Sequence, residues 1–201
     1  MIGSCLAADA LAERGWAILP DFVPAPTWRA LASELHAACA ICSLRAAGVG
    51  MGERYRLAHE ERGDQIQWLE PESASDAQRD ALARFDALRL GLNRELQLGL
   101  FEFECHFALY PPGAGYRSHR DQHLSSDARV LSCVLYLNRD WKAEDEGQLR
   151  LYMDKPETGE YSDVLPEGGT LVCFLSDRFW HEVLPAHRER LSLTGWFRRR
   201  S

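Results

Sequence analysis

The chain has 201 residues, of which 46% are hydrophobic and 26% are charged, a composition typical of a soluble globular protein. This length accommodates one sizeable hydrophobic core, so we expect a single domain over residues 1–201. The formal net charge of -7 argues against a nucleic-acid-binding surface, because phosphate binding requires clustered lysine and arginine. No apolar run approaches the roughly 18 residues of a membrane span, and the N-terminal sequence lacks the basic and apolar regions of a signal peptide.

The cysteines predict core residues rather than a metal site or a disulfide framework. Cys105, Cys133 and Cys173 lie in apolar, strand-like runs, where cysteine behaves as a small hydrophobic residue. Cys39 and Cys42 form a C-x-x-C motif on an expected helix and are predicted to face the core. No second pair of cysteine or histidine residues has matching spacing, which disfavours a zinc or redox role for this motif. Thiols of this kind indicate a reducing, cytoplasmic setting.

The first hundred residues are predicted to form mainly helices, with a few short strands. A strand is expected at residues 15–20, and a helix at residues 27–44, where apolar side chains recur with a helical period. The strongest helix pattern begins at Ser75, which is a candidate capping-box partner of Gln78. An apolar stripe follows along one face of this helix, at Leu82, Phe85, Leu88, Leu92 and Leu96. These helices are expected to support the rest of the fold.

A glycine-rich segment lies between these two helices and has glycines at positions 48, 50 and 52. This pattern indicates a mobile loop, followed by a strand near the sequence QIQWL. The loop either connects two elements or also closes over a bound substrate, and the two interpretations are compatible.

Short β-rich runs replace the helical patterns after Phe101. They are separated by Gly, Pro, Asp and Ser, and their sequences are FEFECHFALY, RVLSCVLYLN, GQLRLYM, GTLVCFLS, FWHEVL and RLSLTGWF. Several short strands at this spacing predict a β-sandwich or barrel over residues 101–200. The expected fold class is therefore α+β but mainly β, with N-terminal helices packed against a C-terminal barrel.

Three residues of this β-rich half form a candidate metal site. His119 and Asp121 are two positions apart, so at a strand end they point to the same side, and His181 follows 62 positions after His119. Two histidines and one carboxylate bind one face of Fe(II) and leave positions open for substrate and oxygen. His123 is an alternative ligand, although the downstream pattern favours the first pair.

Two further histidines have simpler interpretations. His187 lies in a turn-like sequence, PAHRE, and is expected to be exposed. His106 shares a strand face with Tyr110, which places it near the expected cavity, but a buried and hydrogen-bonded histidine is the favoured interpretation.

The C-terminal run RLSLTGWF alternates polar and apolar side chains. In a strand, Arg190, Ser192, Thr194 and Trp196 line one face, and the intervening residues pack on the other. An arginine inside a barrel is costly unless an anion meets it. Because its planar guanidinium grips a carboxylate through two hydrogen bonds, Arg190 is a candidate anchor for a dicarboxylate whose other end binds the metal.

These motifs together resemble a known family. The segments YPPGAGYRSHRD, LSCVLYLNRDW, GQLRLYM and FLSDRFWHEVLPAHRERLSLTGWFRR are similar to the Fe(II)/2-oxoglutarate oxygenases, and in particular to prolyl hydroxylases of the oxygen-sensing type and their bacterial relatives. The resemblance covers residues 101–200 and reaches back to RGDQIQW. It implies a double-stranded β-helix, or jelly-roll, fold.

The resemblance also implies roles for individual residues. His119, Asp121 and His181 match the iron ligands. The residues expected around 2-oxoglutarate are Arg190 and Tyr136 at its distal carboxylate, with Tyr110, Ser192 and Trp196 near the rest of the cofactor. On the substrate side, Asp64 and Arg129 match an ion pair that ties the mobile loop to the barrel, and Tyr116 is either a substrate contact or barrel packing.

The implied activity is hydroxylation of a prolyl residue with Fe(II), 2-oxoglutarate and O₂, with ascorbate as an optional reductant and succinate and CO₂ as products. The bacterial prolyl hydroxylases that act on elongation factor Tu match well, which implies that protein as the partner. Two alternatives remain open: an oxygenase of the same fold that acts on a small molecule or free amino acid, and a non-enzymatic sensor of iron or 2-oxoglutarate. An oxygen-sensing role follows only by analogy with relatives.

Overall fold

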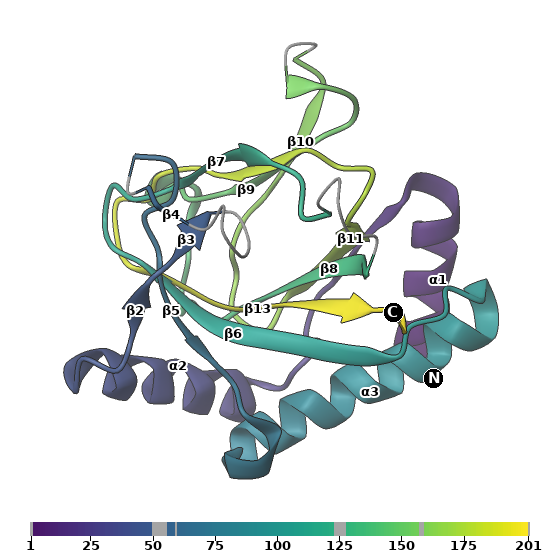
Figure 1. Cartoon of the computed structure of the whole chain (residues 1–201), viewed down its shortest axis with the longest axis horizontal. Helices are drawn as coiled ribbons and strands as arrows, with labels where there is room; N and C mark the ends of the chain where they lie inside the picture. The colour runs from purple at the N-terminus through teal and green to yellow at the C-terminus, as the bar shows by residue number, and fades with distance from the viewer. Residues whose placement is uncertain (1, 50–55, 59, 123–127, 157–158, 201) are drawn as a thin grey trace.

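The structure is a computed structural model that describes residues 2–49, 56–58, 60–122, 128–156 and 159–200. Two antiparallel sheets face each other across an interior, and helices cover the outer side of the larger one (Figure 1). The predicted fold, a mainly β jelly roll supported by N-terminal helices, is confirmed. Among the described residues, no helix is long and apolar enough to cross a membrane.

The larger sheet has seven strands among the described residues, in the order β1–β11–β8–β13–β6–β5–β2. Their bounds are β1 Trp16–Leu19, β2 Arg45–Ala46, β5 Gln65–Trp68, β6 Glu102–Tyr110, β8 Arg129–Tyr136, β11 Leu171–Leu175 and β13 Arg190–Arg198. The strands β1, β2 and β5 precede residue 100, so this sheet takes strands from both halves of the chain. The predicted strands at 15–20 and near QIQWL are confirmed as β1 and β5.

The smaller sheet has the order β10–β9–β12–β7. Its strands are β7 Tyr116–His119, β9 Leu149–Tyr152, β10 Tyr161–Val164 and β12 His181–Val183. A separate two-stranded pairing joins β3 Gly48–Val49 to β4 Arg56–Leu57. The loop between β3 and β4 holds the predicted mobile segment, and its glycines 50 and 52 lie outside the described residues.

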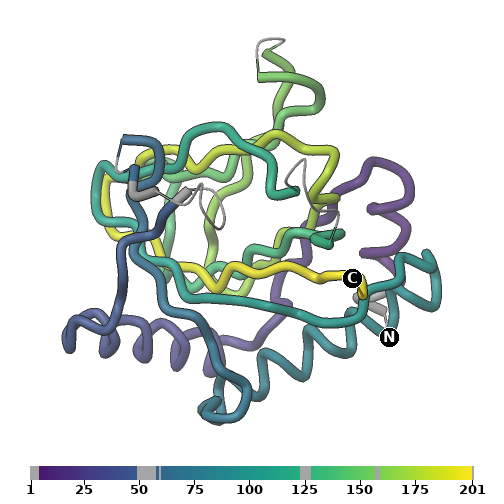
Figure 2. Tube along the Cα trace, viewed as in Figure 1, coloured from purple at the N-terminus to yellow at the C-terminus, as the bar shows by residue number. Residues whose placement is uncertain are grey.

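Three helices pack on one face of the larger sheet, as the purple-to-blue parts of the tube in Figure 2 show. They are α1 Ile2–Arg14, α2 Ala25–Ala40 and α3 Asp76–Leu96, and two short 3₁₀ turns lie at η2 Pro71–Ser73 and η3 Ala143–Asp145. The predicted stripe of α3 is confirmed, because Phe85, Leu88 and Leu92 are buried in the core and Leu82 and Leu96 pack against it.

The N-terminus of α3 differs in one respect from the predicted capping box. The Ser75 hydroxyl accepts a hydrogen bond from the backbone N–H of Gln78 at 3.1 Å, as expected. The Gln78 side chain does not complete the box but donates to Glu34 of α2 at 2.8 Å. This contact ties the two helices together instead of capping one of them.

The prediction that the cysteines belong to the core is confirmed for the three in strands but not for the whole C-x-x-C motif. Cys105, Cys133 and Cys173 are buried. The helix α2 ends at Ala40, before the predicted end at residue 44, and Cys42 adopts a φ of +55°, which is typical of a residue just after a helix. Cys42 is consequently exposed, so the prediction that it faces the core was wrong, whereas Cys39 is half-buried and packs against the core as predicted.

The central strand β13 determines how the fold positions a site. It pairs with β6 along its whole length and with β8 on its other side. The side chains of Leu191, Leu193 and Phe197 belong to the core beneath the helices, whereas Arg190 and Trp196 line a cavity between the sheets. The predicted alternation of β13 is therefore confirmed.

Candidate active site

A cavity of about 680 Å³ lies between the two sheets. Nine of the predicted site residues line it, namely Asp64, Tyr110, Tyr116, His119, Asp121, Arg129, His181, Arg190 and Trp196. Tyr136 of β8 and Ser192 of β13 are fully buried and are partners across the two strands, but they are not among the lining residues. The fold thus gathers around one cavity residues that are spread over more than a hundred positions of the chain.

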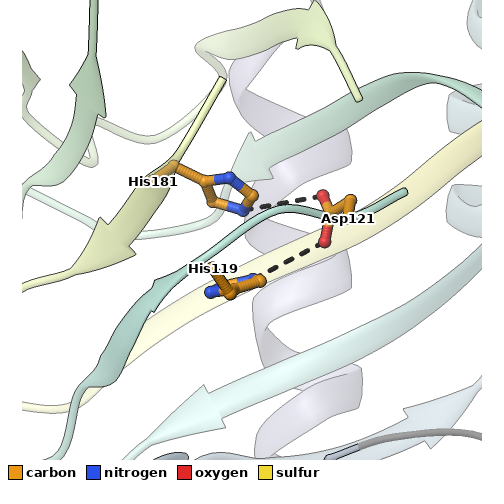
Figure 3. A group of neighbouring side chains, drawn as sticks. All are labelled: His119, Asp121 and His181. Carbon is orange, nitrogen blue, oxygen red and sulfur yellow. Dashed lines mark ion pairs between the residues drawn. The ribbon is translucent and has the colours of Figure 1, made fainter. Parts of the chain in front are cut away.

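The three candidate metal ligands converge at one end of the cavity (Figure 3). His119 at the end of β7 is the cross-strand partner of His181 at the start of β12, so strand pairing holds the two imidazoles side by side. Asp121 follows β7 and completes the group, with each carboxylate oxygen 3.5 Å from the Nε2 atom of one histidine. The ligand atoms all lie within 4.8 Å of one another, a spacing at which one ion contacts all three.

Backbone carbonyls orient both imidazoles. The Nδ1 atom of His119 lies 2.8 Å from the carbonyl oxygen of Arg117, and that of His181 lies 3.3 Å from the carbonyl of Phe179. A proton on Nδ1 satisfies these carbonyls and leaves the Nε2 lone pair directed toward Asp121, where a metal would sit. The arrangement selects the tautomer that a metal ligand requires.

The electrostatics of the cluster also suit a metal. Burial lowers the pKa of His181 to about 4, so this imidazole is neutral near pH 7. Burial alone would raise the pKa of Asp121, but the two imidazoles and the hydroxyl of Ser132 hold it well below its usual value. Neutral imidazole and ionised carboxylate are the forms that bind a divalent cation.

Two serines support Asp121, and sequence reasoning did not find them. The Ser132 hydroxyl, from β8, donates to Asp121 Oδ2 at 2.7 Å and lies 2.8 Å from the hydroxyl of Ser176. Both serines are buried. Nothing in the local sequence marks them, because Ser132 contacts the carboxylate from β8 and Ser176 contacts Ser132 from the turn after β11, both far from Asp121 in the chain.

Arg190 occupies the wall of the cavity as a buried cation. Its residue is 1% exposed, and its Nε donates to the carbonyl oxygen of Gly147 at 2.9 Å. A side chain at Gly147 would collide with Ala186 and crowd Trp141, and its φ of +73° also favours glycine. Gly147 is a further residue that sequence reasoning missed, although it begins the quoted run GQLRLYM.

Donors beside Arg190 have no partner within the protein. The buried side-chain atoms without a hydrogen bond, among the described residues, include Arg190 Nη2 and the hydroxyl of the adjacent Tyr136. Trp196 Nε1, further along β13, also has none. Burial raises the pKa of Tyr136 to about 12, so its hydroxyl keeps its proton. Unmatched buried donors around an unpaired guanidinium fit an anionic ligand, and a dicarboxylate such as 2-oxoglutarate meets that requirement.

The predicted ion pair between Asp64 and Arg129 does not form. Both oxygens of Asp64 instead accept hydrogen bonds from Arg62, at 2.7 and 2.9 Å. Arg129 pairs with Glu104 at 3.0 Å and lies 3.5 Å from the ring centroid of Trp196. Asp64 pairs with Arg62 for a local reason: Arg62 is only two residues away, and its planar guanidinium binds both carboxylate oxygens.

The other residues singled out in the sequence differ in their burial. Tyr116 is half-buried and stacks on His119, with ring centroids 3.7 Å apart, so it lies against a candidate metal ligand. His106 is buried, with its Nδ1 3.0 Å from the carbonyl of Phe107, and it also lines the cavity. The side chain of His187 is exposed, as predicted. His123 lies outside the described residues.

A two-histidine, one-carboxylate cluster inside a double-stranded β-helix defines the class of non-haem Fe(II) oxygenases. Comparison with known proteins agrees, because the profile of the 2OG-Fe(II) oxygenase superfamily matches residues 105–198. The chain is 34% identical to prolyl hydroxylase EGLN3 of Homo sapiens over 173 residues, covering 82% of this chain and 69% of that protein. It is also 34% identical to human Egl nine homolog 1 over 145 residues, covering 68% of this chain but only 33% of that longer protein.

Two solved structures share the whole fold. A prolyl-4-hydroxylase of Pseudomonas putida is 49% identical, with a TM-score of 0.87 and coverage of 98% of this chain and 100% of that one. A prolyl hydroxylase of Trichoplax adhaerens, solved with a hypoxia-inducible factor peptide fragment, is 26% identical, with a TM-score of 0.84 and coverage of 97% and 88%. The chain therefore belongs to the prolyl hydroxylase family within the 2OG-Fe(II) oxygenase superfamily, whose cofactors are Fe(II), 2-oxoglutarate and O₂.

Proposed function

We propose that this protein is a 2-oxoglutarate-dependent prolyl 4-hydroxylase that modifies a prolyl residue of another protein, and that elongation factor Tu is its substrate. The observation that carries the proposal is one cavity that holds both the His119, Asp121 and His181 cluster and the buried, unpaired guanidinium of Arg190. A metal site and an anion anchor in the same cavity fit a dicarboxylate that chelates the metal at one end and binds the arginine at the other.

Each end of the cavity would hold one part of the cofactor set. His119, Asp121 and His181 would bind Fe(II), and Arg190 with the Tyr136 hydroxyl would receive the distal carboxylate of 2-oxoglutarate. Tyr110, Ser192 and Trp196 would complete the walls around the cofactor. When bound, iron and 2-oxoglutarate supply the oxidising power that places one oxygen atom of O₂ on a C–H bond and releases succinate and CO₂.

The protein's own residues would bind and orient the cofactors and shield them from water. Neutral His181 and ionised Asp121 would keep the metal on one side of the cavity, so the other side stays open to substrate. Val134, Leu149 and Val183 give the cavity apolar walls that limit the entry of water. These roles require rigid placement, which the paired strands provide.

A protein substrate is favoured by the relatives and by the rim of the cavity. The structure of the Trichoplax adhaerens relative contains a peptide fragment. Asp64, Arg129 and Tyr116 line the cavity here and are proposed to contact such a chain. We further propose that residues 1–201 act as a single oxygenase domain in a reducing, cytoplasmic setting, where the six free cysteine thiols would remain reduced.

Mass spectrometry of elongation factor Tu tests the proposal directly. Incubation with the protein, Fe(II), 2-oxoglutarate and air should add one oxygen atom to a single proline. The gain should vanish with Asp121→Ala and persist with Asp86→Ala, a matched control at an exposed carboxylate on α3. No gain on this substrate, from a protein that binds iron and 2-oxoglutarate, would refute the proposed partner and direct the search to other proteins or to small molecules.

A further inference from the structure

The charges around the cavity are unbalanced toward the positive side, although the chain as a whole carries a net charge of -7. Six arginines and four carboxylates line the cavity among the described residues. Asp121 belongs to the metal cluster, and Arg190 is the anion anchor behind it. The other lining charges decide what the mouth of the cavity attracts.

Most of these charges are neutralised within the protein. Arg62 is bound to Asp64 through two hydrogen bonds. Arg129 and Arg198 share Glu104, at 3.0 and 3.3 Å. On the outer helix α3, the arginines at positions 79, 84 and 89 also each pair with an aspartate three or four residues away. Three of the six arginines that line the cavity, namely Arg62, Arg129 and Arg198, thus have a carboxylate partner.

Arg117 and Arg120 depart from this arrangement. Both are exposed and both line the cavity, on the strand β7 and the turn that carry His119 and Asp121. Within the described part of the chain, neither guanidinium forms an ion pair with a carboxylate. The fourth lining carboxylate, Glu61, is the backbone partner of Arg117, whose N–H donates to the Glu61 carbonyl oxygen at 2.8 Å. The Arg120 side chain donates to the carbonyl oxygen of Asp177 at 3.2 Å and lies 5.2 Å from the ring centroid of Trp180. These contacts hold its guanidinium in place without neutralising its charge.

We propose that Arg117 and Arg120 form a subsite for acidic side chains of the protein substrate, close in sequence to the prolyl residue that enters the cavity. This inference rests on the proposed function and narrows it to acidic prolyl segments. Arginine suits the role because its fork binds a carboxylate through two parallel hydrogen bonds. Substrate binding would supply to them the kind of carboxylate partner that the protein itself provides to Arg62, Arg129 and Arg198.

The expected effect is moderate because the subsite is exposed. Charges at an open rim act mainly on association and are screened by salt, so each contact should contribute only a few-fold to affinity. The discriminating signature is therefore a preference for negative charge that weakens as ionic strength rises. Binding of 2-oxoglutarate and Fe(II) should not depend on it.

A peptide panel measures that signature. Labelled prolyl peptides carrying Asp or Glu beside the proline are compared with the isosteric Asn and Gln peptides, using fluorescence anisotropy with the Fe(II)- and 2-oxoglutarate-loaded protein without O₂. The acidic peptides should bind roughly 5- to 20-fold more tightly at low salt, corresponding to two rim contacts of a few-fold each. The same peptides are then incubated in air to measure hydroxylation.

Charge reversal provides the variant test. Arg117→Glu with Arg120→Glu should abolish the preference or turn it toward Lys-containing peptides. The control, Arg94→Glu with Arg139→Glu, makes the same change in net charge at exposed sites outside the cavity and should keep the preference. Arg117→Gln with Arg120→Gln guards against misfolding, and iron content and 2-oxoglutarate affinity should remain at the level of the unaltered protein in each variant.

The outcomes separate the two proposals. Equal binding of acidic and amide peptides, or a preference that survives charge reversal, overturns the subsite. Hydroxylation without any charge preference leaves the prolyl hydroxylase proposal standing and removes the subsite. Selective binding of acidic peptides with no hydroxylation of any of them supports the subsite and refutes the proposed function.

Discussion

The two faces of strand β13 differ in how completely the protein satisfies them. On one face, Leu191, Leu193 and Phe197 pack into a continuous apolar core with the three helices. On the other, Arg190 and Trp196 are as deeply buried, yet each keeps a donor atom without a partner. The same backbone carries both faces, so the difference lies entirely in alternate side chains.

This contrast indicates a division of work between the faces. The apolar face is complete without any ligand, and its burial stabilises the fold. The cavity face leaves charge and hydrogen-bonding capacity unused, which costs folding free energy until a ligand supplies the missing partners. Substitutions on the two faces should consequently separate stability from cofactor binding.

Substitution of a metal ligand should have the largest effect. His181→Ala removes one of three ligands, and we expect turnover of 2-oxoglutarate to fall by at least about 100-fold, since losing even a residue that supports a ligand commonly costs 10- to 100-fold. Iron content after loading and succinate release measure the effect. His187→Ala, at an exposed histidine, is the control and should change neither quantity. Normal turnover by the first variant would reject His181 as a ligand.

Substitution of the anion anchor should come next. Arg190→Ala removes the buried guanidinium, and we expect 2-oxoglutarate affinity to fall by about 30-fold or more, or ~2–5 kcal/mol for a buried charge pair. Titration calorimetry of the iron-free protein measures this loss. Arg188→Ala, two residues away and outside the cavity lining, should leave the affinity unchanged. Unaltered affinity in Arg190→Ala would show that the dicarboxylate binds elsewhere.

The opposite face should give the opposite result. Leu193→Ala leaves a cavity in the core, and we expect the free energy of unfolding to fall by about 2–5 kcal/mol. The affinity for 2-oxoglutarate should be unchanged at temperatures well below the unfolding transition. Urea unfolding and the same calorimetry give the two quantities, with the exposed Leu90→Ala as the control for side-chain truncation. A large loss of affinity in Leu193→Ala would break the proposed division between the faces.

The sequence predicted the features that depend on strand periodicity. The alternation of β13 placed Arg190 on the cavity side, and the two-residue spacing of His119 and Asp121 placed them together. Both follow from local backbone geometry, which side chains of neighbouring strands do not alter. The apolar stripe of α3 was predictable for the same reason.

Features that depend on contacts between distant segments were not predictable. Ser132 reaches Asp121 only because β8 lies beside the metal cluster in the folded protein. Arg129 pairs with Glu104, 25 residues away in the chain, rather than with Asp64. In each case the outcome is set by side-chain positions that the local sequence does not specify.

The smallest expected effect concerns His106, a buried residue on the cavity side of β6 that packs between Trp68 and Trp196. Burial lowers its pKa from 6.5 to about 4, the charges of Arg62 and Arg129 act in the same direction, and Asp64 opposes them. Between these two pH values the unfolded chain binds the proton more readily than the folded protein. Stability should therefore fall as the pH falls through this range, by about 1 kcal/mol between pH 7 and pH 5.5 from this group.

Urea unfolding of the metal-free protein across this pH range isolates the contribution by comparison with His106→Gln. The variant should lose about 1 kcal/mol less than the unaltered protein between pH 7 and pH 5.5, because glutamine binds no proton in either state. An unaltered slope in His106→Gln would mean that the cavity side accommodates a charged imidazole at this position. The cavity side would then stabilise buried charge without a ligand, which the unmatched donors of Arg190 and Tyr136 argue against.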